Sequence, residues 1–340
     1  MDRFSVQDLA DWKSLAEQTL SGHQLTFEEA LQILRAPDED LLDILAAAYR
    51  IRRRYFGNSV QLHFLINAKS GLCPEDCGYC SQSKTSTADV PKYNIVDRDT
   101  LLEGAAAAAA RRAKTYCIVI SARGPSEREL HALESIVPEI KKRHSLKICV
   151  SLGLLTGTQT RRLKACGVDR VNHNLNTGRD FYGEICSSHT YQDRLDTIQA
   201  IRDADLEICA GGIVGMGERD EDTVSMVLEL REIGTSSIPV NFLEPVRGTA
   251  LENVRHLDPR RCLKTLAMCR FACPSTEIRI AGGRELHLGS LQPLGLYAAN
   301  SIFVGDYLTT KGQAADADFR MIEDMGLSIV EPETAEIRDA

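Results

Sequence analysis

Several features are missing from this sequence, and each absence narrows what the protein can do. No uninterrupted apolar stretch approaches the length of a membrane span, and the first residues, Met-Asp-Arg-Phe-Ser-Val-Gln-Asp, lack the apolar core of a secretory signal. Basic charge is not in excess, because the formal net charge is -8, so nothing favours nucleic-acid binding. We therefore expect a cytoplasmic protein, in which the eleven cysteines serve as metal ligands or buried thiols.

Cysteine is absent from residues 1–72, and then three cysteines follow within eight residues. Cys73, Cys77 and Cys80 form the run Cys-Pro-Glu-Asp-Cys-Gly-Tyr-Cys, whose proline, glycine and acidic residues indicate an exposed loop. Thiolates at this spacing can each reach a different iron of one [4Fe–4S] cube, whereas a cube held only by protein needs four cysteines. The motif therefore predicts a [4Fe–4S] cluster with one iron left open to a small molecule.

Two other kinds of site also use closely spaced cysteines. A zinc site usually has a second Cys-x-x-Cys pair or histidine ligands, and no second pair at that spacing follows. A ferredoxin-like electron carrier would need a fourth cysteine nearby, and the next one is Cys117. The open [4Fe–4S] cluster is therefore the favoured interpretation.

After residue 60, short β-rich runs alternate with amphipathic helical stretches at intervals of roughly 30 residues, as in βα units. Eight strands are predicted, at residues 62–69, 116–121, 147–152, 170–176, 207–214, 237–243, 277–282 and 301–307. Eight such units predict an α/β fold, a (β/α)8 TIM-type barrel. A doubly wound open sheet is the alternative, because residues 211–217 resemble a dinucleotide-binding turn, but a glycine pattern alone is weak evidence.

The residues before the barrel have the pattern of an N-terminal helical extension. Thr26 and Glu29 form a capping box, and the next helix is predicted from about Asp38 to a stop at Gly57. Its predicted apolar face consists of Leu41, Leu42 and Leu45. We expect three parts in the chain: the helical extension at 1–60, the barrel at 61–315, and a C-terminal helical segment and tail at 316–340.

Polar and sulfur-bearing side chains fall on the inward-facing positions of the predicted strands. Alternate residues of a barrel strand face the interior, and the others face the helices and should be apolar. Each of the following stands between two apolar neighbours and is predicted to face inward: Cys117, Cys149, Cys209, Asn241 and Arg279. The same parity places Asn172, Asn174 and Asn176 inside. Barrel interiors are normally filled by branched apolar side chains, so this polar interior needs a functional explanation.

The buried Arg279 indicates why the barrel interior is polar. A guanidinium in a barrel interior is very costly without an anionic partner, and iron-bound thiolates would provide the negative charge. Each cysteine alone is explained by burial as a small hydrophobic residue. Together, the four residues predict a second iron–sulfur cluster held by Cys117, Cys149 and Cys209, with Arg279 beside it.

The whole set of residues resembles the radical S-adenosylmethionine (SAM) enzymes, and within them the family that inserts sulfur into dethiobiotin. The three-cysteine motif with Tyr79 specifies the superfamily, and the second cysteine set with Arg279 specifies the family. The resemblance covers nearly the whole chain, with further matching segments at residues 172–177, 191–197, 211–218, 237–241, 278–285 and 299–303.

The resemblance implies the last step of biotin biosynthesis. The open iron would bind SAM, and its reductive cleavage would give a 5′-deoxyadenosyl radical that abstracts hydrogen from two unactivated carbons of dethiobiotin. The inserted sulfur would come from an auxiliary [2Fe–2S] cluster ligated by Cys117, Cys149, Cys209 and Arg279. By similarity, SAM would be held by Tyr79, Asn174, Asn176, Arg194, Ile213 and Val214, and dethiobiotin by Asn174 and Asn241. A homodimer and a flavodoxin-type electron donor are also implied.

One residue departs from the family pattern, and the role that the family implies for another is unusual for its type. Family members often have an aspartate where this chain has Asn176; its amide can still accept from ribose hydroxyls, but a charged contact is lost. Arginine is ordinarily always protonated, so direct ligation of iron by Arg279 is implied by the resemblance alone.

Two other functions remain as alternatives. One is a radical SAM barrel acting on a different small molecule; a lipoyl synthase would carry a further cysteine motif before the radical motif, where residues 1–72 have none. The other is an iron–sulfur electron carrier, which would not need eight βα units or an asparagine-lined interior.

Overall fold

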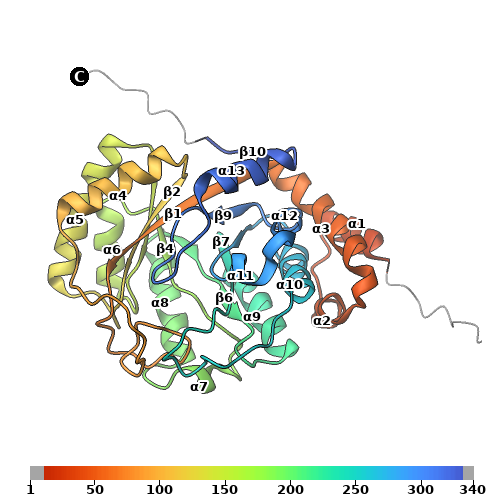
Figure 1. The fold of residues 1–340 in the computed structure, drawn as a ribbon, viewed down its shortest axis with the longest axis horizontal. Coiled ribbons are helices and arrows are strands. Elements are labelled where there is room, and N and C mark those ends of the chain that lie inside the picture. The colour runs from red at the N-terminus through yellow and green to blue at the C-terminus, as the bar shows by residue number, and fades with distance from the viewer. Residues whose placement is uncertain (1–10, 332–340) are drawn as a thin grey trace, which may run out of the picture.

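A closed barrel of parallel strands forms the centre of the computed structural model, which describes residues 11–331 (Figure 1). The strands follow the order β1-β2-β3-β4-β5-β7-β8-β9, and β9 pairs with β1 to close the ring. The strand predicted at 207–214 is divided into β5 and β6, which both pair with β7. The predicted (β/α)8 TIM-type barrel is confirmed, and the open-sheet alternative is wrong because β1 and β9 leave no free edge between them.

The strands lie close to the predicted segments. Their bounds are β1 (Ser59–Lys69), β2 (Thr115–Ile120), β3 (Lys147–Ser151), β4 (Arg170–Asn172), β5 (Glu207–Cys209), β6 (Gly212–Val214), β7 (Ser237–Phe242), β8 (Glu277–Ile280), β9 (Ser301–Phe303) and β10 (Ser328–Ile329). β4 and β9 end four residues earlier than predicted, because the chain there leaves the sheet and turns over the mouth of the barrel. β10 adds to the first two residues of β1.

Helices surround the strands, and three of them form the N-terminal extension, which packs against α10 (Figure 1). Their bounds are α1 (Trp12–Leu20), α2 (Phe27–Arg35), α3 (Leu41–Phe56), α4 (Arg98–Ala110), α5 (Glu127–Arg143), α6 (Gly157–Ala165), α7 (Tyr182–Ile185), α8 (Tyr191–Asp203), α9 (Asp220–Ile233), α10 (Pro259–Ala272), α11 (Arg284–Leu288), α12 (Gln292–Gly295) and α13 (Ala315–Asp324). Short 3-10 turns occupy Asp38–Asp40 and Gly289–Leu291.

The N-terminal extension shows one correct and one incorrect detail of the sequence prediction. The capping box is present at α2: the hydroxyl of Thr26 accepts from the amide of Glu29 at 3.2 Å, and the Glu29 carboxylate accepts from the amide of Thr26 at 2.8 Å. α3 ends at Gly57 as predicted, but Leu42 does not belong to its apolar face, because 68% of it is exposed. Helical rotation places Leu41 and Leu45 against the core and Leu42 toward solvent.

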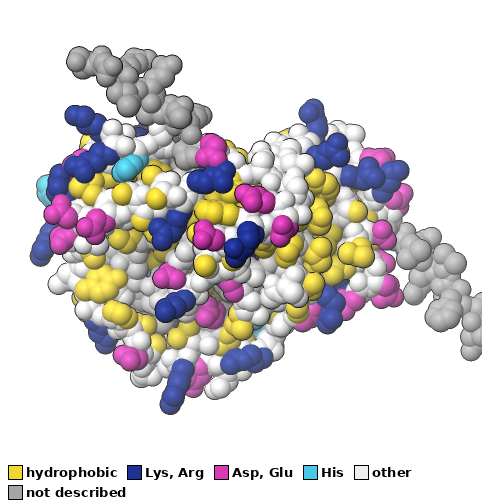
Figure 2. Space-filling model, turned by 45° about the horizontal axis from the view of Figure 1, so that its top comes forward, with side chains coloured by type: hydrophobic (Ala, Val, Ile, Leu, Met, Phe, Trp, Pro, Cys, Tyr) yellow, Lys and Arg dark blue, Asp and Glu magenta, His cyan; other side chains and the backbone are white. Residues whose placement is uncertain are grey.

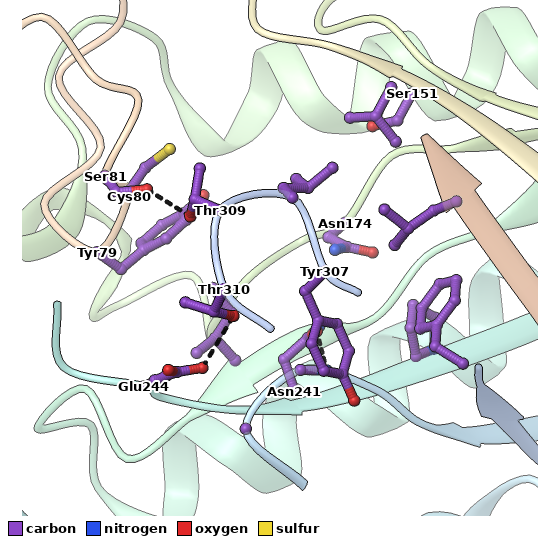
Figure 3. A pocket seen from close by; sticks show the side chains of 18 of the residues that line it. Tyr79, Cys80, Ser81, Ser151, Asn174, Asn241, Glu244, Tyr307, Thr309 and Thr310 are labelled. Carbon is purple, nitrogen blue, oxygen red and sulfur yellow. Dashed lines mark hydrogen bonds between the residues drawn. The ribbon is translucent and has the colours of Figure 1, made fainter. Parts of the chain in front are cut away.

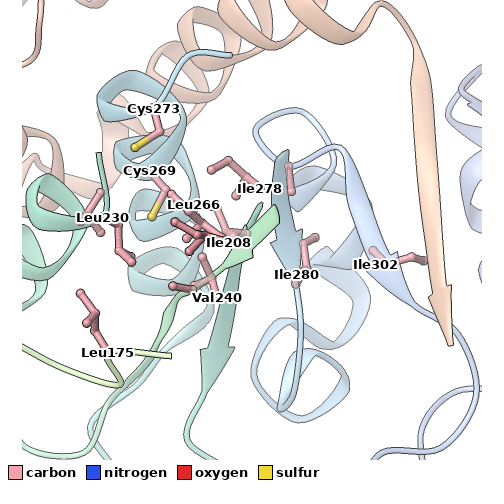
Figure 4. Packing of buried hydrophobic residues seen from close by; sticks show 14 of the residues in the cluster. Leu175, Ile208, Leu230, Val240, Leu266, Cys269, Cys273, Ile278, Ile280 and Ile302 are labelled. Carbon is pink, nitrogen blue, oxygen red and sulfur yellow. The ribbon is translucent and has the colours of Figure 1, made fainter. Parts of the chain in front are cut away.

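The hydrophobic core is the layer between the strands and the helices. Figure 4 shows outward-facing strand residues such as Ile208, Val240 and Ile278 directed toward α10, where Cys269 and Cys273 pack against them. All five of these residues are buried. Burying one such aliphatic side chain contributes about 1.5–3 kcal/mol, so this layer stabilises the barrel while leaving the interior positions to polar groups.

The outer surface carries both signs of charge. On the face drawn in Figure 2, Lys and Arg side chains are interspersed with Asp and Glu, and neither sign gathers into one field. Among the described residues, no helix is long and apolar enough to cross a membrane.

The C-terminal part of the described chain is fixed to the barrel by a buried ion pair. Nη1 of Arg284, after β8, lies 2.7 Å from Oδ1 of Asp318 on α13, and both side chains are almost fully buried. This pair therefore connects α13 to the end of the barrel strand that carries Arg279.

We expect Asp318→Asn to lower the free energy of unfolding by about 3 kcal/mol, because a buried guanidinium loses its ionised partner. Chemical denaturation of the full chain measures this change. Asp316→Asn, at an exposed position on the same helix, is the matched control and should leave stability unchanged. Equal effects of the two substitutions would show that the buried pair is not a stabilising contact.

Candidate functional site

The cysteine-rich loop follows β1 at the carboxyl ends of the barrel strands, where barrel active sites form. Cys73, Cys77 and Cys80 all lie on this loop. The amide of Gly78 donates to the carbonyl of Ile185 at 2.8 Å, which fixes the middle of the loop against the last residue of α7. The loop is therefore held both by β1, from which it starts, and by the end of α7.

The three loop cysteines line a cavity of about 190 Å³, here called the outer chamber, together with Tyr79, Asn174, Asn176 and Arg194. Burial raises the pKa of the Cys73 thiol, and burial raises that of Cys80 to about 11. Thiols with raised pKa values stay protonated until a metal ion displaces the proton. Three thiols from one loop that face one cavity are a fitting donor set for a cluster with one open corner.

A second cavity of about 280 Å³, here called the inner chamber, lies deeper in the barrel and is lined by Cys117, Asn241 and Arg279. Figure 3 shows Tyr79, Asn174 and Asn241 around this cavity, with Thr309 and Thr310 of the loop after β9 beside them. The two chambers are contiguous, because they share the following lining residues: Tyr79, Cys80, Gln82, Val119, Ser151, Asn172, Asn174 and Leu308.

The three barrel cysteines are in contact with one another, and Cys117 among them lines the inner chamber while Cys149 and Cys209 are fully buried behind it. Cys117 and Cys149 are register partners on β2 and β3. Contact with the Cys117 thiol, together with burial, raises the pKa of Cys149, which also contacts Cys209. Sγ of Cys209 accepts from Nδ2 of Asn172 at 3.3 Å. The structure thus brings together the thiols from β2, β3 and β5.

Arg279 on β8 lies beside these thiols, with Nη1 3.9 Å from Sγ of Cys209. Nη2 donates to Oε1 of Glu277 at 2.5 Å and to Oγ of Ser237 at 2.8 Å, whereas Nε has no partner among the described residues. Burial alone would lower the pKa of Arg279, but the Glu277 carboxylate together with the neighbouring thiols of Cys209 and Cys117 raises it. Glu277 therefore supplies part of the negative charge that was predicted to come from iron-bound thiolates. This residue was overlooked in the sequence analysis.

Further charges lie below Arg279 at the base of the barrel. Arg170 is 3.0 Å from the Glu277 carboxylate and 2.8 Å from that of Glu207, which also pairs with Lys147. Burial and the charge of Arg279 lower the pKa of His63 to about 4, so this ring is neutral. The two buried arginines are therefore matched by two carboxylates, and Lys147 joins this set from a partly exposed position.

Asn176 joins the outer chamber to the cysteine loop. Its Nδ2 donates to the hydroxyl of Tyr79 at 2.6 Å, and its carbonyl accepts from the amide of Ile213 at 2.8 Å. Its φ of 72° lies in the left-handed region, which asparagine, aspartate and glycine enter at least cost. The exchange of aspartate for asparagine at this position therefore preserves the backbone shape.

Of the other residues predicted to contact SAM or dethiobiotin, all but one line a chamber. Nη1 of Arg194 donates to the carbonyl of Asn174 at 2.9 Å, and Ile213 lines the inner chamber. Asn241 also lines it, although its amide already donates to Gly212 and accepts from Gly282, each at 3.0 Å. Val214 is buried and is not among the residues that line either chamber.

Sequence reasoning did not assign the pair Cys186 and His189, which lies beside the cysteine loop. Sγ of Cys186 is 3.8 Å from Sγ of Cys77 and 3.3 Å from Nδ1 of His189. No spacing pattern connects residue 77 with residue 186, so only the fold reveals this group. For Glu277 a pattern existed, because it stands two residues before Arg279 and so shares the inward face of β8.

Comparison with known proteins identifies relatives over most of the chain. Residues 69–230 match the model of the radical SAM superfamily, and residues 239–328 match that of the biotin and thiamin synthesis associated domain. The chain is 60% identical to the biotin synthase of Rhodopirellula baltica, over 94% of this chain and 89% of that protein. It is 56% identical to the biotin synthase of Geobacillus kaustophilus and 51% to that of Bacillus subtilis, over 94% of this chain and 96% and 95% of those proteins.

Solved structures share the fold at low sequence identity. Methylornithine synthase aligns with a TM-score of 0.82 at 19% identity, over 94% of this chain and 98% of that one. The FeFe-hydrogenase maturase HydG from Carboxydothermus hydrogenoformans aligns with a TM-score of 0.80 at 16% identity, over 94% of this chain and 79% of that one. At these identities the likeness concerns the barrel architecture alone.

We expect Asn176→Ala to be less stable than Asn176→Gly by about 1 kcal/mol, because alanine is strained at a positive φ and glycine is not. Both substitutions remove the amide that contacts Tyr79, so the difference isolates the backbone conformation. Urea denaturation of the two variants measures it. Equal midpoints would mean that this residue does not hold a left-handed conformation.

Proposed function

The chain belongs to the biotin synthase family of radical SAM enzymes, and on this premise we propose that it inserts sulfur between two unactivated carbons of dethiobiotin, the last step of biotin formation. One observation carries the proposal for this chain. The outer chamber at the three-cysteine loop is contiguous with the inner chamber, whose lining includes Cys117; behind this lining Cys149 contacts Cys117, and Cys209 contacts Cys149. A molecule in the shared space would lie between the two thiol sets.

The two thiol sets fit two different clusters. We assign Cys73, Cys77 and Cys80 to a [4Fe–4S] cluster that leaves one iron for SAM. We assign the deeper thiols to an auxiliary [2Fe–2S] cluster, with Arg279 as the fourth ligand. When bound, SAM and the clusters supply the 5′-deoxyadenosyl radical that abstracts hydrogen and the sulfur that is inserted. The chain itself binds and orients the cofactors and the substrate, and it excludes water.

The charge distribution supports an anionic group at the deeper site. Nη1 of Arg279 lies 3.9 Å from Sγ of Cys209, so a cluster bound by thiolates would bring negative charge to this guanidinium. The partnerless Nε of Arg279 would gain a neighbour there. Glu277 and Ser237 hold the guanidinium in a fixed orientation, so the arginine needs no rearrangement to meet the cluster.

The residues of the outer chamber would hold SAM. We propose that Tyr79 lies near the adenine, that Asn174, Asn176 and Arg194 bind polar groups of the nucleoside and amino acid, and that Ile213 and Val214 contribute backbone contacts. Tyr79 and Asn176 already form one hydrogen bond, which holds their polar atoms at the chamber wall. Because Val214 lies outside the lining, its contribution would pass through the backbone of β6.

Dethiobiotin would occupy the inner chamber, between Asn174 and Asn241. Asn174 lines both chambers, so it is suited to contact SAM and dethiobiotin together. Asn241 is oriented by its hydrogen bonds to Gly212 and Gly282, which supports a fixed amide at the substrate site. Apolar walls from Leu65, Val119 and other residues would keep water from a reactive carbon.

The electron donor, the oligomeric state, the location and the division of the chain are also proposed from the sequence. We propose a flavodoxin-type electron donor, a homodimer and a cytoplasmic location, the last supported by the absence of any disulfide among the eleven cysteines. We also keep the division into residues 1–60, 61–315 and 316–340, although residues 332–340 of the tail lie outside the described part.

We expect the anaerobically reconstituted wild-type chain to bind about six irons and Cys149→Ala about four, because the substitution removes a ligand of the smaller cluster only. Iron analysis and the visible spectrum measure this loss. Cys269→Ala, which removes a thiol from the packing layer, is the control and should keep the wild-type iron content. A full iron count in Cys149→Ala would refute the deeper cluster.

In an anaerobic assay with dethiobiotin, SAM and a reductant, we expect about one biotin per chain and a matching loss of the smaller cluster, because that cluster would be the sulfur source. Biotin and the visible spectrum are followed together, with dethiobiotin omitted as the control. SAM cleavage stimulated by dethiobiotin would separate this enzyme from an electron carrier. Repeated turnover with the smaller cluster intact, without added sulfide, would contradict the proposed sulfur source.

A further inference from the structure

A compact group of metal-binding side chains lies at the wall of the outer chamber, which two of its members, Cys77 and His189, line, and the proposed reaction uses only one member of the group. Cys77 comes from the loop after β1, and Cys186 and His189 come from the segment between α7 and α8. One ligand atom from each residue lies within 4.8 Å of the other two, and all three side chains are buried.

The spacing of these atoms matches a tetrahedral metal site. With Zn–S bonds of about 2.3 Å, tetrahedral geometry puts two sulfur ligands about 3.8 Å apart and a sulfur and a nitrogen ligand about 3.5 Å apart. In the structure, Sγ of Cys77 and Sγ of Cys186 are 3.8 Å apart, and Sγ of Cys186 is 3.3 Å from Nδ1 of His189. Little movement is therefore needed to place a zinc ion between the three atoms.

Carboxylate oxygens complete the surroundings. Oδ1 of Asp76 lies 3.3 Å from Sγ of Cys186, and a carboxylate oxygen of Glu75 contacts Nδ1 of His189. Either oxygen can serve as a fourth ligand, because zinc accepts oxygen beside sulfur and nitrogen. Two thiolates and a carboxylate would also attract a divalent cation.

The backbone holds the two halves of this group together. The amide of Gly78 donates to the carbonyl of Ile185, next to Cys186, at 2.8 Å. The amides of Ser187 and Ser188 donate to Oδ1 of Asp76, each at 3.0 Å. These three hydrogen bonds orient the ligands toward one another.

We propose that Cys77, Cys186 and His189 bind one zinc ion in the chain that lacks iron–sulfur clusters. Binding releases the thiol protons and leaves Cys77 bound to zinc. The same sulfur is then unavailable to iron, so zinc at this site and the cluster at the three-cysteine loop exclude each other. Only this exclusion depends on the proposed function; the zinc site does not.

The first experiment measures zinc binding to the full-length chain, freed of metal and kept reduced, by titration against a chelator of known affinity. We expect one tight site in the wild type and weakening of at least about 100-fold in Cys186→Ser, which removes a direct ligand. Cys166→Ser is the matched control, because this thiol caps α6 and contacts only the Leu163 carbonyl in the described hydrogen-bond network. Cobalt(II) in place of zinc reports thiolate ligation through its absorption spectrum.

Tight binding unchanged in Cys186→Ser would overturn the proposal, since the zinc would then be held by other cysteines. If Cys186→Ser does not fold, His189→Asn provides the same comparison.

The second experiment adds one equivalent of zinc before reconstitution with iron and sulfide. We expect the wild type to gain only the smaller cluster and Cys186→Ser to gain both. Full reconstitution of zinc-loaded wild type would overturn the exclusion, whereas the first experiment would still test the zinc site by itself.

Discussion

Closure of the barrel by the pairing of β9 with β1 is the constraint on which the site depends. Leu62 pairs with Ile302 in this register, although 240 positions of sequence separate them. Because both strands run in the same direction, the loops at their carboxyl ends meet at one mouth. The cysteine loop after β1 and the loop carrying Thr309 and Thr310 therefore border the same cavity. The hydroxyl oxygens of Ser81 and Thr309 are hydrogen-bonded there at 2.9 Å. An open sheet would hold these loops at opposite edges.

A second constraint is the charge balance inside the barrel. Barrel interiors are usually apolar, but this one contains two arginines and a carboxylate that share hydrogen bonds at its base. Glu277 joins Arg170 to Arg279 and so fixes the guanidinium that faces the thiols. The packing layer on the other side of each strand stabilises the fold independently, which allows the interior to be polar. Stability and chemistry are thus divided between the two faces of the same strands.

The sequence predicted the barrel because eight βα units follow one another along it, and it predicted the inward-facing positions because alternation along a strand is a local property. It predicted strand lengths less well, since the ends of β4 and β9 depend on loops that cross the mouth. Leu42 was assigned to the buried face because apolar character alone does not fix helical rotation. The role of Glu277 as counter-ion was overlooked even though its parity with Arg279 was visible, whereas the contact of Cys186 with Cys77 depends on long-range folding and left no local pattern.

The pairing of β10 with the start of β1 has a consequence for how the chain is made. Val60, near the beginning of the barrel, pairs with Ile329, close to the end of the described residues. During synthesis on the ribosome the first residues of β1 stay unpaired on this edge until residues 328 and 329 have emerged. An unpaired strand edge is a site of aggregation. Until then this edge of β1 is open to pairing with strands of other chains.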